Sequence, residues 1–566
     1  MPDGIAGPRP PVAGPDREDS EEEWPTRHRV RGLWCVLSLA LLFLLGLFFR
    51  YQVIGPLERD TFVRPAFSQR QKGVPVTLAR GNILDRCGVP LHYPVWESAL
   101  AVFPGEARDS PGTRQAVASV LGLQSYGGPP LPGPGDAPVK VARHLSASQI
   151  ERALEIGEAA GLAVVPEEQR YGPGSLACHV VGHIRSNAYL DPRDNMGESG
   201  LERSFQSRLA GGQPAWAGVV TTGEGEDVPG TGLRIAPPDG VPLDVFTTID
   251  ASIQREVESA LDRLDVKTGA VVVLDAQTAL VLAMASRPVF DQNHPDRSLA
   301  GPGAPFVNRA ISAFTPGSVF KPVVMSFALE RGYASPGETF VCQGQITIGG
   351  RKVSCGNTKE GHGLVTPLEA VAKSCNSTLI QIGLRIDPVE LVEYTRKCGF
   401  GSAAGIPLAD EAQGALPDPH RMYAGDLANL CIGQGYVTVT PLQVAAFFRA
   451  IAAGGLYQEP TLIHADAKGT PVRLFSQETA TELQDALLLA TREGTGMKAW
   501  VPRLGSAGKT GTAETGYSTG LTHAWFCGWT PVLAPRYVIC VFVEEGGDGP
   551  GVAAPAFREI ASRIQP

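Results

Sequence analysis

The segment TPGSVFKPV, residues 315–323, contains a serine, Ser318, three positions before a lysine, Lys321. A serine hydroxyl is a weak nucleophile near neutral pH, and a lysine amine can activate it only when burial or a neighbouring cation lowers the lysine pKa. The spacing places both side chains on one face of a helix. The Pro-Gly turn predicts a helix N-terminus near Ser318, where backbone N–H groups and the helix dipole can stabilise an oxyanion. The pattern therefore suits covalent acyl transfer through Ser318.

Ser-x-x-Lys alone is a weak signal. It occurs by chance about once or twice in a chain of this size, and a capping serine followed by an exposed lysine would look the same. Two further motifs make it specific: Ser-Cys-Asn at residues 374–376 and Lys-Thr-Gly at residues 509–511. In this order, the three motifs are typical of serine acyl-transferases that react with penicillin.

Other segments match the same group of proteins. They are RGNILDRCGVPL (80–91), GESGLERSF (197–205), TTIDASIQ (247–254), NRAISAFTPGSVFKP (308–322), IGQGYVTVTPLQVA (432–445) and HAWFCGWTP (523–531). With these segments the chain resembles, over about residues 30–566, the class B penicillin-binding proteins, which are monofunctional D,D-transpeptidases that cross-link bacterial peptidoglycan.

The resemblance implies a role for each residue of the first two motifs. Ser318 attacks the carbonyl of the penultimate D-alanine of a stem pentapeptide, releases the terminal D-alanine and holds the peptide as an acyl-enzyme. Lys321, neutral before attack, takes the serine proton. Ser374 relays a proton to the leaving group, and Asn376 holds Lys321 and the substrate amide.

The third motif is expected to bind the substrate. By the same resemblance, Lys509 supplies positive charge, and Thr510 and Thr512 bind the terminal carboxylate of the peptide or of a β-lactam antibiotic. Backbone N–H groups of Ser318 and Thr512 form the oxyanion hole. Gly511 has no side chain, so this edge strand can approach the bound peptide closely. No cofactor and no metal ion are expected.

The order of predicted elements favours an α+β fold. Residues 269–286 show the pattern of two strands joined by a turn, and three more strand patterns occur at 509–515, 524–531 and 536–545. The sequence between these two regions is largely helical in pattern. Strands at both ends of a domain indicate one antiparallel sheet closed by terminal strands, as opposed to a doubly wound parallel sheet. By the resemblance this is the serine β-lactamase-like transpeptidase domain, preceded by an irregular β-rich pedestal domain and one transmembrane helix.

The membrane segment is GLWCVLSLALLFLLGLFF, residues 32–49, which carries no charge and is about long enough to cross a bilayer. A cleaved signal peptide is the alternative. Arg27, Arg29 and Arg31 precede the segment and only Arg50 follows it at once, which keeps the N-terminus in the cytoplasm and the catalytic part outside the cell membrane. The expected domains are a cytoplasmic tail (1–31), a single-pass transmembrane anchor (32–50), a dimerisation-type pedestal domain (51–240) and a transpeptidase domain (241–566).

The cysteines show no metal-ligand or disulfide-framework spacing. Ten are present, and Cys342 and Cys355 flank a Gly-rich segment that resembles a hairpin. They could pair as a disulfide or be two small buried side chains, and both interpretations stay open. Cys375, inside the second motif, could be a buried packing residue or a redox-sensitive thiol. The histidines of HVVGH, residues 179–183, have helical two-ligand spacing but lack the glutamate of a zinc protease, so packing or hydrogen bonding is expected.

Composition limits the partners. With a formal net charge of -9, the chain does not have the basic balance of a nucleic-acid-binding protein. The pedestal is too short and loop-rich for a glycan-polymerising domain. The resemblance therefore implies peptidoglycan stem peptides on lipid-linked nascent glycan as substrate, β-lactams as inhibitors and a membrane glycosyltransferase of the shape, elongation, division and sporulation (SEDS) family as partner. It does not decide among elongation, division and sporulation.

Two other functions are compatible with the motifs. The same site could use water as acceptor, which would make the protein a β-lactamase or a D,D-carboxypeptidase. A penicillin-binding partner protein or sensor without catalysis is the third possibility. The membrane-proximal module argues against a simple hydrolase, and the three intact motifs argue against loss of catalysis.

Overall fold

The structure is a computed structural model of the whole chain. It describes residues 23–49, 71–78, 80–103, 111–128, 130–132, 136–156, 161–185, 196–211, 214–220, 233–236, 240–356, 358, 360–464, 470–515 and 520–565. Most of the expected cytoplasmic tail (residues 1–22), the last residue of the expected anchor (Arg50) and the start of the expected pedestal (residues 51–70) lie outside these ranges. The chain forms two compact units, one of residues 74–217 with 234–566, the other of residues 1–73 with 218–233.

A five-stranded sheet forms the centre of the C-terminal part. Its order is β10 (Val281–Arg287), β9 (Gly269–Asp275), β19 (Tyr537–Val543), β18 (Thr522–Thr530) and β17 (Ala507–Glu514). Every pairing is antiparallel. The prediction of one antiparallel sheet closed by C-terminal strands is therefore confirmed, and β17, which carries the Lys-Thr-Gly motif, is an edge strand.

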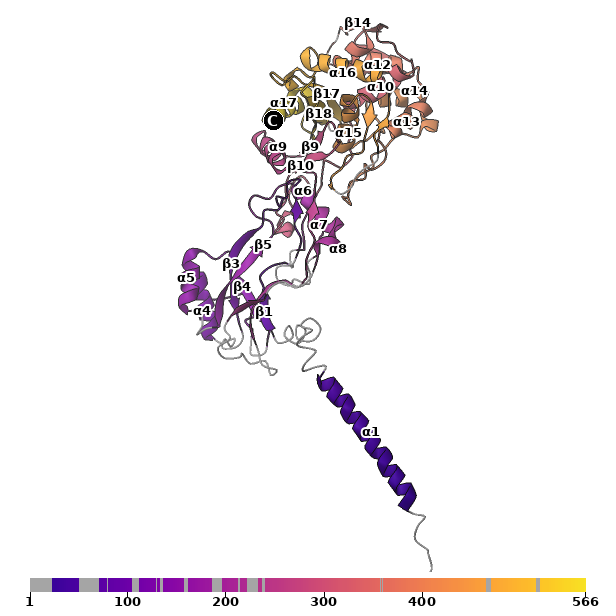
Figure 1. Cartoon of the computed structure of the whole chain (residues 1–566). Coiled ribbons are helices and arrows are strands. Elements are labelled where there is room, and N and C mark those ends of the chain that lie inside the picture. The colour runs from indigo at the N-terminus through magenta and orange to yellow at the C-terminus, as the bar shows by residue number, and fades with distance from the viewer. Residues whose placement is uncertain are drawn as a thin grey trace, which may run out of the picture. The chain divides into compact units, whose positions relative to one another are not determined.

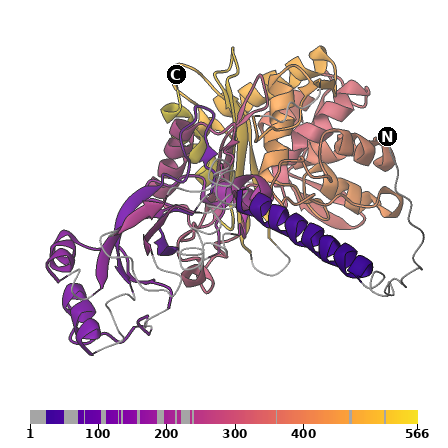
Figure 2. The same ribbon diagram turned by 60° about the horizontal axis from the view of Figure 1, so that its bottom comes forward.

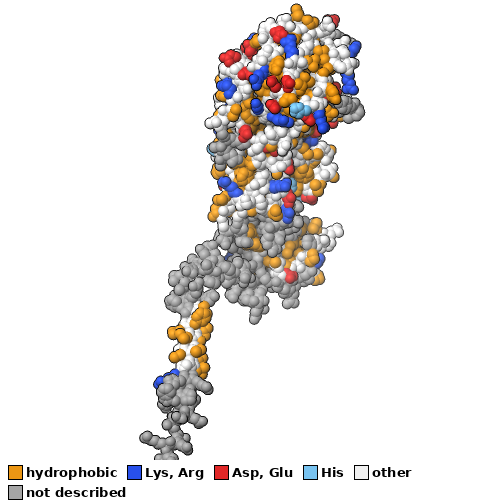
Figure 3. All heavy atoms as spheres, turned by 90° about the vertical axis from the view of Figure 1, so that its right-hand side faces the viewer, with side chains coloured by type: hydrophobic (Ala, Val, Ile, Leu, Met, Phe, Trp, Pro, Cys, Tyr) orange, Lys and Arg blue, Asp and Glu red, His pale blue; other side chains and the backbone are white. Residues whose placement is uncertain are grey.

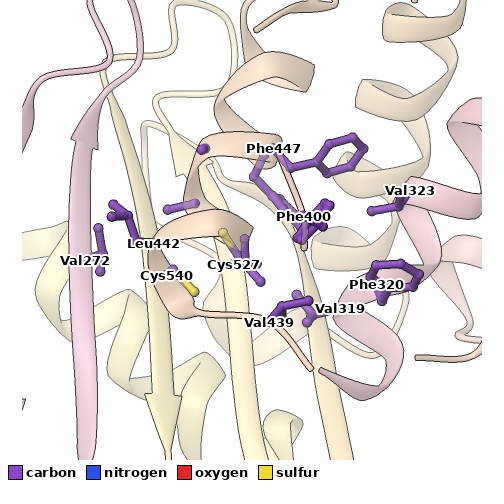
Figure 4. Packing of buried hydrophobic residues seen from close by; sticks show 14 of the residues in the cluster. Val272, Val319, Phe320, Val323, Phe400, Val439, Leu442, Phe447, Cys527 and Cys540 are labelled. Carbon is purple, nitrogen blue, oxygen red and sulfur yellow. The ribbon is translucent and has the colours of Figure 1, made fainter. Parts of the chain in front are cut away.

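Both faces of this sheet are buried, because residues of alternating direction along β9 enter two different hydrophobic clusters. Val271 and Val273 pack with helices α9 (Ala251–Arg263) and α17 (Ala554–Arg563). Val272 faces the other way, and Figure 4 shows it beside Leu442 of helix α15 (Pro441–Ala452) and the sheet cysteines. Continuous apolar strands of this kind are expected where helices cover both faces of a sheet.

Helices and short strands form the rest of this part, and all of them except η9 lie between β10 and β17 in the sequence (Figure 1). Local sequence signals set the helix starts: Thr366 and Thr440 make capping boxes, and the Asp250 side chain caps α9. The helical elements are η5 (Pro295–Ser298), η6 (Gly317–Phe320), α10 (Lys321–Glu330), α11 (Pro367–Ala372), α12 (Asn376–Gly383), α13 (Pro388–Lys397), η7 (Pro419–Arg421), α14 (Ala424–Cys431), α16 (Gln477–Arg492), η8 (Met497–Ala499) and the π-helical turn η9 (Gly549–Ala553). The strands are β11 (Phe340–Cys342), β12 (Gln345–Ile348), β13 (Arg351–Ser354), β14 (Gly363–Val365), β15 (Leu456–Tyr457) and β16 (Val472–Arg473).

The N-terminal part has smaller elements, as expected for an irregular module. A sheet of order β4 (Val139–Ala142), β3 (Val95–Val102), β5 (Leu162–Gln169) shares a hydrophobic cluster with α4 (Pro111–Leu121) and α5 (Ala147–Ile156), which lie together in Figure 2. The other elements are β1 (Gln71–Pro75), β2 (Ile83–Leu84), α6 (Cys178–Val181), α7 (Gly200–Ser204), α8 (Gln206–Leu209), β6 (Trp216–Val220), β7 (Arg234–Ala236) and β8 (Val245–Phe246).

A buried ionic cluster joins two of the segments that suggested the resemblance. Glu202 accepts hydrogen bonds from Arg80 Nε and Arg170 Nε, each at 2.5 Å. All three side chains are nearly or fully inaccessible to solvent. Burial alone would raise the pKa of Glu202, but the two guanidinium groups outweigh it and lower that pKa. The carboxylate therefore stays charged and ties residues 80–81, 170 and 202 together.

Helix α1 (Glu23–Phe49) contains the expected membrane segment. Apolar side chains such as Leu39 and Phe43 are exposed along it. Figure 3 shows hydrophobic side chains along this helix in orange. Among the residues that the structure describes, no helix meets the combined requirements of length and apolarity for crossing a bilayer. The expected span is therefore not confirmed.

Candidate active site

Ser318 lies in η6, a 3-10 turn that leads directly into α10. Its neighbours Gly317 and Val319 are buried, while Ser318 itself is partly exposed. The predicted helix start is thus present, with the difference that the α-helix begins at Lys321. Gly317 has φ +57°, and a side chain there would place its Cβ 2.5 Å from the Thr512 carbonyl oxygen. Only glycine fits this turn, which presses the serine segment against strand β17.

Lys321 is fully buried at the start of α10. Its Nζ donates hydrogen bonds to Asn376 Oδ1 at 2.6 Å, to the Ser374 carbonyl at 2.8 Å and to Ser374 Oγ at 3.2 Å. Burial disfavours the charged amine and lowers the pKa of Lys321 from 10.5 to about 8, although the nearby thiols of Cys355 and Cys375 act in the opposite direction. The amine that the sequence predicts as a base is thus desolvated and held in one position.

The Ser-Cys-Asn motif forms the tight connection between α11 and α12. Ser374 has φ +57°, which costs a non-glycine residue about 1–3 kcal/mol and turns the chain so that both Ser374 and Asn376 reach Lys321. Asn376 is fixed on its other side, because its Nδ2 donates to the Ser354 carbonyl at 2.8 Å. Two residues of the motif therefore converge on one amine.

Lys509 is fully buried on β17. Its Nζ donates to the Thr510 carbonyl at 2.9 Å and to Thr510 Oγ1 at 3.3 Å. The Thr510 hydroxyl shares a 2.7 Å hydrogen bond with Thr495 Oγ1, which is also 3.5 Å from Lys509 Nζ. Burial, followed by the charge of Lys321, lowers the pKa of Lys509 well below its usual value. An anion beside this amine would favour its charged form.

Thr495 is a site residue that the sequence motifs did not indicate. It lies between α16 and η8, outside every motif used above. A hydroxyl next to glycine residues in a loop has no distinguishing pattern, so only the folded chain identifies it.

Gly511 and Thr512 lie where β17 meets the serine turn, the segment of Pro316 and η6 that carries Ser318. A Cβ on Gly511 would be 2.8 Å from the Pro316 carbonyl oxygen and 3.2 Å from Val319 Cβ. Packing against the serine turn therefore explains this glycine, in addition to the expected approach of a peptide. Thr512 is exposed, and its Oγ1 accepts a hydrogen bond from Gly549 N at 3.2 Å. The oxyanion role of the Ser318 and Thr512 amides stays a prediction.

The other candidate residues lie elsewhere. His179 Nε2 is 2.7 Å from the Pro305 carbonyl, and His183 Nδ1 is 2.7 Å from Ser199 Oγ. Both rings thus make hydrogen bonds, as the sequence predicts. Cys342 and Cys355 flank the β12–β13 hairpin as expected and are buried, free thiols in the structure, whereas the sequence leaves both a disulfide and buried thiols open. Cys375 is buried, with its Sγ 3.4 Å from Cys355 Sγ.

Two family models match the chain. The penicillin-binding protein transpeptidase domain matches residues 269–562, and the penicillin-binding protein dimerisation domain matches residues 75–228. The first match alone covers more than half of the chain. The chain belongs to the class B penicillin-binding proteins.

Individual relatives of this class B penicillin-binding protein agree with the family. Stage V sporulation protein D of Bacillus subtilis is 30% identical over 86% of this chain and 78% of the relative. The peptidoglycan D,D-transpeptidase FtsI of Escherichia coli is 28% identical over 94% of this chain and 90% of the relative.

Solved structures show the same fold. A chain from a peptidoglycan synthase complex, described as coordinating polymerisation and cross-linking, has a TM-score of 0.71, 28% identity and coverage of 95% of this chain and 99% of its own. Penicillin-binding protein 3 of Mycobacterium tuberculosis, solved with ampicillin, has a TM-score of 0.61, 26% identity and coverage of 86% and 94%.

Proposed function

We propose that this class B penicillin-binding protein is a serine D,D-transpeptidase that cross-links peptidoglycan stem peptides through an acyl-enzyme at Ser318. The observation that carries the proposal is the environment of Lys321. Its buried Nζ, with a pKa lowered to about 8, is bound by Ser374 and Asn376 one turn after Ser318. The name of FtsI, a peptidoglycan D,D-transpeptidase, supports the same reaction.

Acylation begins with the neutral Lys321 amine. It takes the proton of Ser318 Oγ as the oxygen attacks the carbonyl carbon of the penultimate D-alanine. Backbone N–H groups of Ser318 and Thr512 stabilise the resulting oxyanion. Ser374 Oγ, 3.2 Å from Lys321 Nζ, passes a proton to the departing D-alanine amine, and the peptide remains bound to Ser318 as an ester.

Substrate binding is assigned to the β17 side of the site. Lys509 with Thr510 and Thr512 binds the terminal carboxylate of the stem peptide, and Thr495 orients the Thr510 hydroxyl through their 2.7 Å hydrogen bond. A β-lactam presents a carboxylate and a strained amide at the same positions, which explains how it acylates Ser318. An acceptor amine from a neighbouring stem then resolves the acyl-enzyme and completes the cross-link.

The division of the chain is also proposed. The family matches at 75–228 and 269–562 support a pedestal at 51–240 and a transpeptidase domain at 241–566. A membrane anchor at 32–50, with a cytoplasmic tail at 1–31, rests on the sequence and would be tested by alkaline extraction of cell membranes. A SEDS-family glycosyltransferase is the proposed partner, because this chain needs nascent glycan and resembles a subunit of a peptidoglycan synthase complex.

The test is intact-mass spectrometry of the full chain after incubation with benzylpenicillin. Wild type should gain the mass of the whole drug, and Ser318→Ala should gain nothing. Ser312→Ala, at a partly buried serine of the same segment, is the matched control and should be acylated like wild type. Rapid loss of the adduct with drug turnover would instead indicate a hydrolase, and absence of any adduct would indicate a non-catalytic protein.

A further inference from the structure

Three cysteines and one histidine meet beside the Ser-Cys-Asn motif. They are Cys342 at the end of β11, Cys355 after β13, His362 before β14, and Cys375 before α12. Their ligand atoms, three Sγ and one imidazole nitrogen, all lie within 4.8 Å of one another. The three thiols are buried and the histidine is partly buried. The sequence spacing did not indicate this cluster, because its members come from four segments.

The separations agree with those of ligands around one tetrahedral zinc ion. Zinc–sulfur bonds of about 2.3 Å and zinc–nitrogen bonds of about 2.0 Å place neighbouring ligands about 3.5–3.8 Å apart. His362 Nδ1 is 3.5 Å from Cys342 Sγ and 3.4 Å from Cys355 Sγ, and the sulfur atoms of Cys355 and Cys375 are 3.4 Å apart. Small shifts of the side chains would suffice to receive an ion.

Backbone amides already point at two of the sulfur atoms. Asn376 N donates to Cys355 Sγ at 3.1 Å, and Thr378 N donates to Cys375 Sγ at 3.4 Å. Donors of this kind orient the ligands of a metal site and stabilise the negative charge of thiolates. If these cysteines only filled space in the core, no imidazole and no backbone N–H groups would need to face their sulfur atoms. The observed arrangement therefore favours a metal site over simple packing.

In the part of the chain that the structure describes, the segments around the cluster form two-stranded sheets, and the β12–β13 hairpin packs on the main core through Ile346, Ile348 and Val353. β12 and β13 form a two-stranded hairpin whose residues are exposed or partly exposed, and β11 and β14 form another two-stranded pair. Isolated two-stranded hairpins are marginally stable in water. At Gly361, φ is +84° and a Cβ would lie 2.2 Å from the Cys342 carbonyl oxygen, so the His362 loop runs directly against the Cys342 segment. A bound ion would hold these strands against α12.

We propose that Cys342, Cys355, His362 and Cys375 bind one zinc ion that fixes the Ser-Cys-Asn motif. Four protein ligands of the Cys3His type form a closed site, which is the arrangement of structural zinc, and soft thiolates favour zinc over magnesium or calcium. Cys375 stands between Ser374 and Asn376, the two residues that hold Lys321, so the ion constrains both neighbours through the backbone. A disulfide between Cys342 and Cys355 would remove two ligands, so ion and disulfide exclude each other.

The first experiment measures metal content. Full-length protein purified under reducing conditions without chelator should contain about one zinc ion per chain by elemental analysis. Cys342→Ser and His362→Ala should lose most of it. Cys398→Ser, at another fully buried cysteine that does not belong to this cluster, is the control and should keep it. The proposal would be overturned if wild type contained no zinc although its thiols were reduced, or if it contained a Cys342–Cys355 disulfide. It would also be overturned if the control variant lost as much zinc as the ligand variants.

The second experiment does not depend on whether variants fold. Wild type whose metal has been removed by a chelator is titrated with Co²⁺, which should give the absorption bands of tetrahedral cobalt–thiolate at one equivalent and be displaced by zinc. Absence of these bands would contradict the proposed ligands.

The effect on catalysis rests on the proposed function. Metal removal should slow acylation by benzylpenicillin by about 10-fold to 100-fold, the scale for a displaced catalytic group, and zinc should restore it. Zinc binding without any acylation would refute the catalytic proposal alone. Normal acylation of the metal-free protein would refute the positioning role of the ion.

Discussion

The most direct prediction concerns the proton of Lys321. Its pKa is lowered from 10.5 to about 8 by complete burial. That shift corresponds to about 3.4 kcal/mol, and it raises the neutral fraction of the amine at pH 7 from about 0.03% to about 9%. If neutral Lys321 is the base, the acylation rate should rise about tenfold per pH unit below pH 8 and level off above it. The rate follows the deprotonated form, so it falls as pH falls.

The assay is stopped-flow or quenched acylation of the full chain by a chromogenic β-lactam between pH 6 and 9.5. Lys321→Arg keeps a positive charge at every accessible pH, so its acylation should be about 100-fold to 10,000-fold slower and independent of pH through this window. The control Lys397→Arg changes an exposed lysine and should follow wild type. A flat wild-type profile, or a Lys321→Arg profile with the wild-type inflection, would refute the assignment of the base.

Three further predictions follow from single contacts. Glu202→Ala leaves Arg80 and Arg170 buried without their carboxylate, so denaturant unfolding should show a loss of about 3–5 kcal/mol; an unchanged midpoint would contradict the buried ionic cluster. Gly511→Ala places a Cβ 2.8 Å from the Pro316 carbonyl oxygen, which should lower the free energy of unfolding by about 1–3 kcal/mol and slow acylation. Unchanged acylation kinetics would show that the turn moves away without affecting Ser318. Thr495→Val should weaken capture of carboxylate-bearing β-lactams, seen as a higher apparent binding constant in saturation kinetics, with stability within about 1 kcal/mol of wild type; unaltered binding would remove Thr495 from the site.

Local patterns predicted much of the fold because the forces that set these elements act over short distances. The apolar runs at 269–286 and 536–545 became β9, β10 and β19, and Asp250 starts its helix as the capping rule expects. The three motifs predicted the site because acyl transfer requires a nucleophile, a base and a cation that binds the substrate carboxylate. The first two motifs lie at turns and helix starts, and the third lies on the edge strand β17, where Gly511 marks a close approach.

Contacts between distant segments could not be predicted in this way. Thr495 joins Lys509 and Thr510 only through the fold, and the meeting of Cys342 with Cys375 depends on how two hairpins close over α12. The left-handed backbone conformation of Ser374 could not be predicted from the sequence either, because serine does not favour that conformation and the surrounding structure imposes it. Sequence spacing describes neighbours along the chain, whereas these features are set by tertiary packing.

The pairing of β9 with β19 has a consequence for how the protein is made. Asp275 pairs with Tyr537 and Gly269 with Val543, so the middle of the sheet joins the beginning of the domain to nearly its last residues. Closing so long a loop is entropically costly, which slows folding, and β9 keeps an open apolar edge until β19 has been synthesised. The transpeptidase sheet therefore completes only after β19 has been synthesised, and a chain cut before Tyr537 would expose the edges of β9 and β18 and aggregate, without retaining a partly working enzyme.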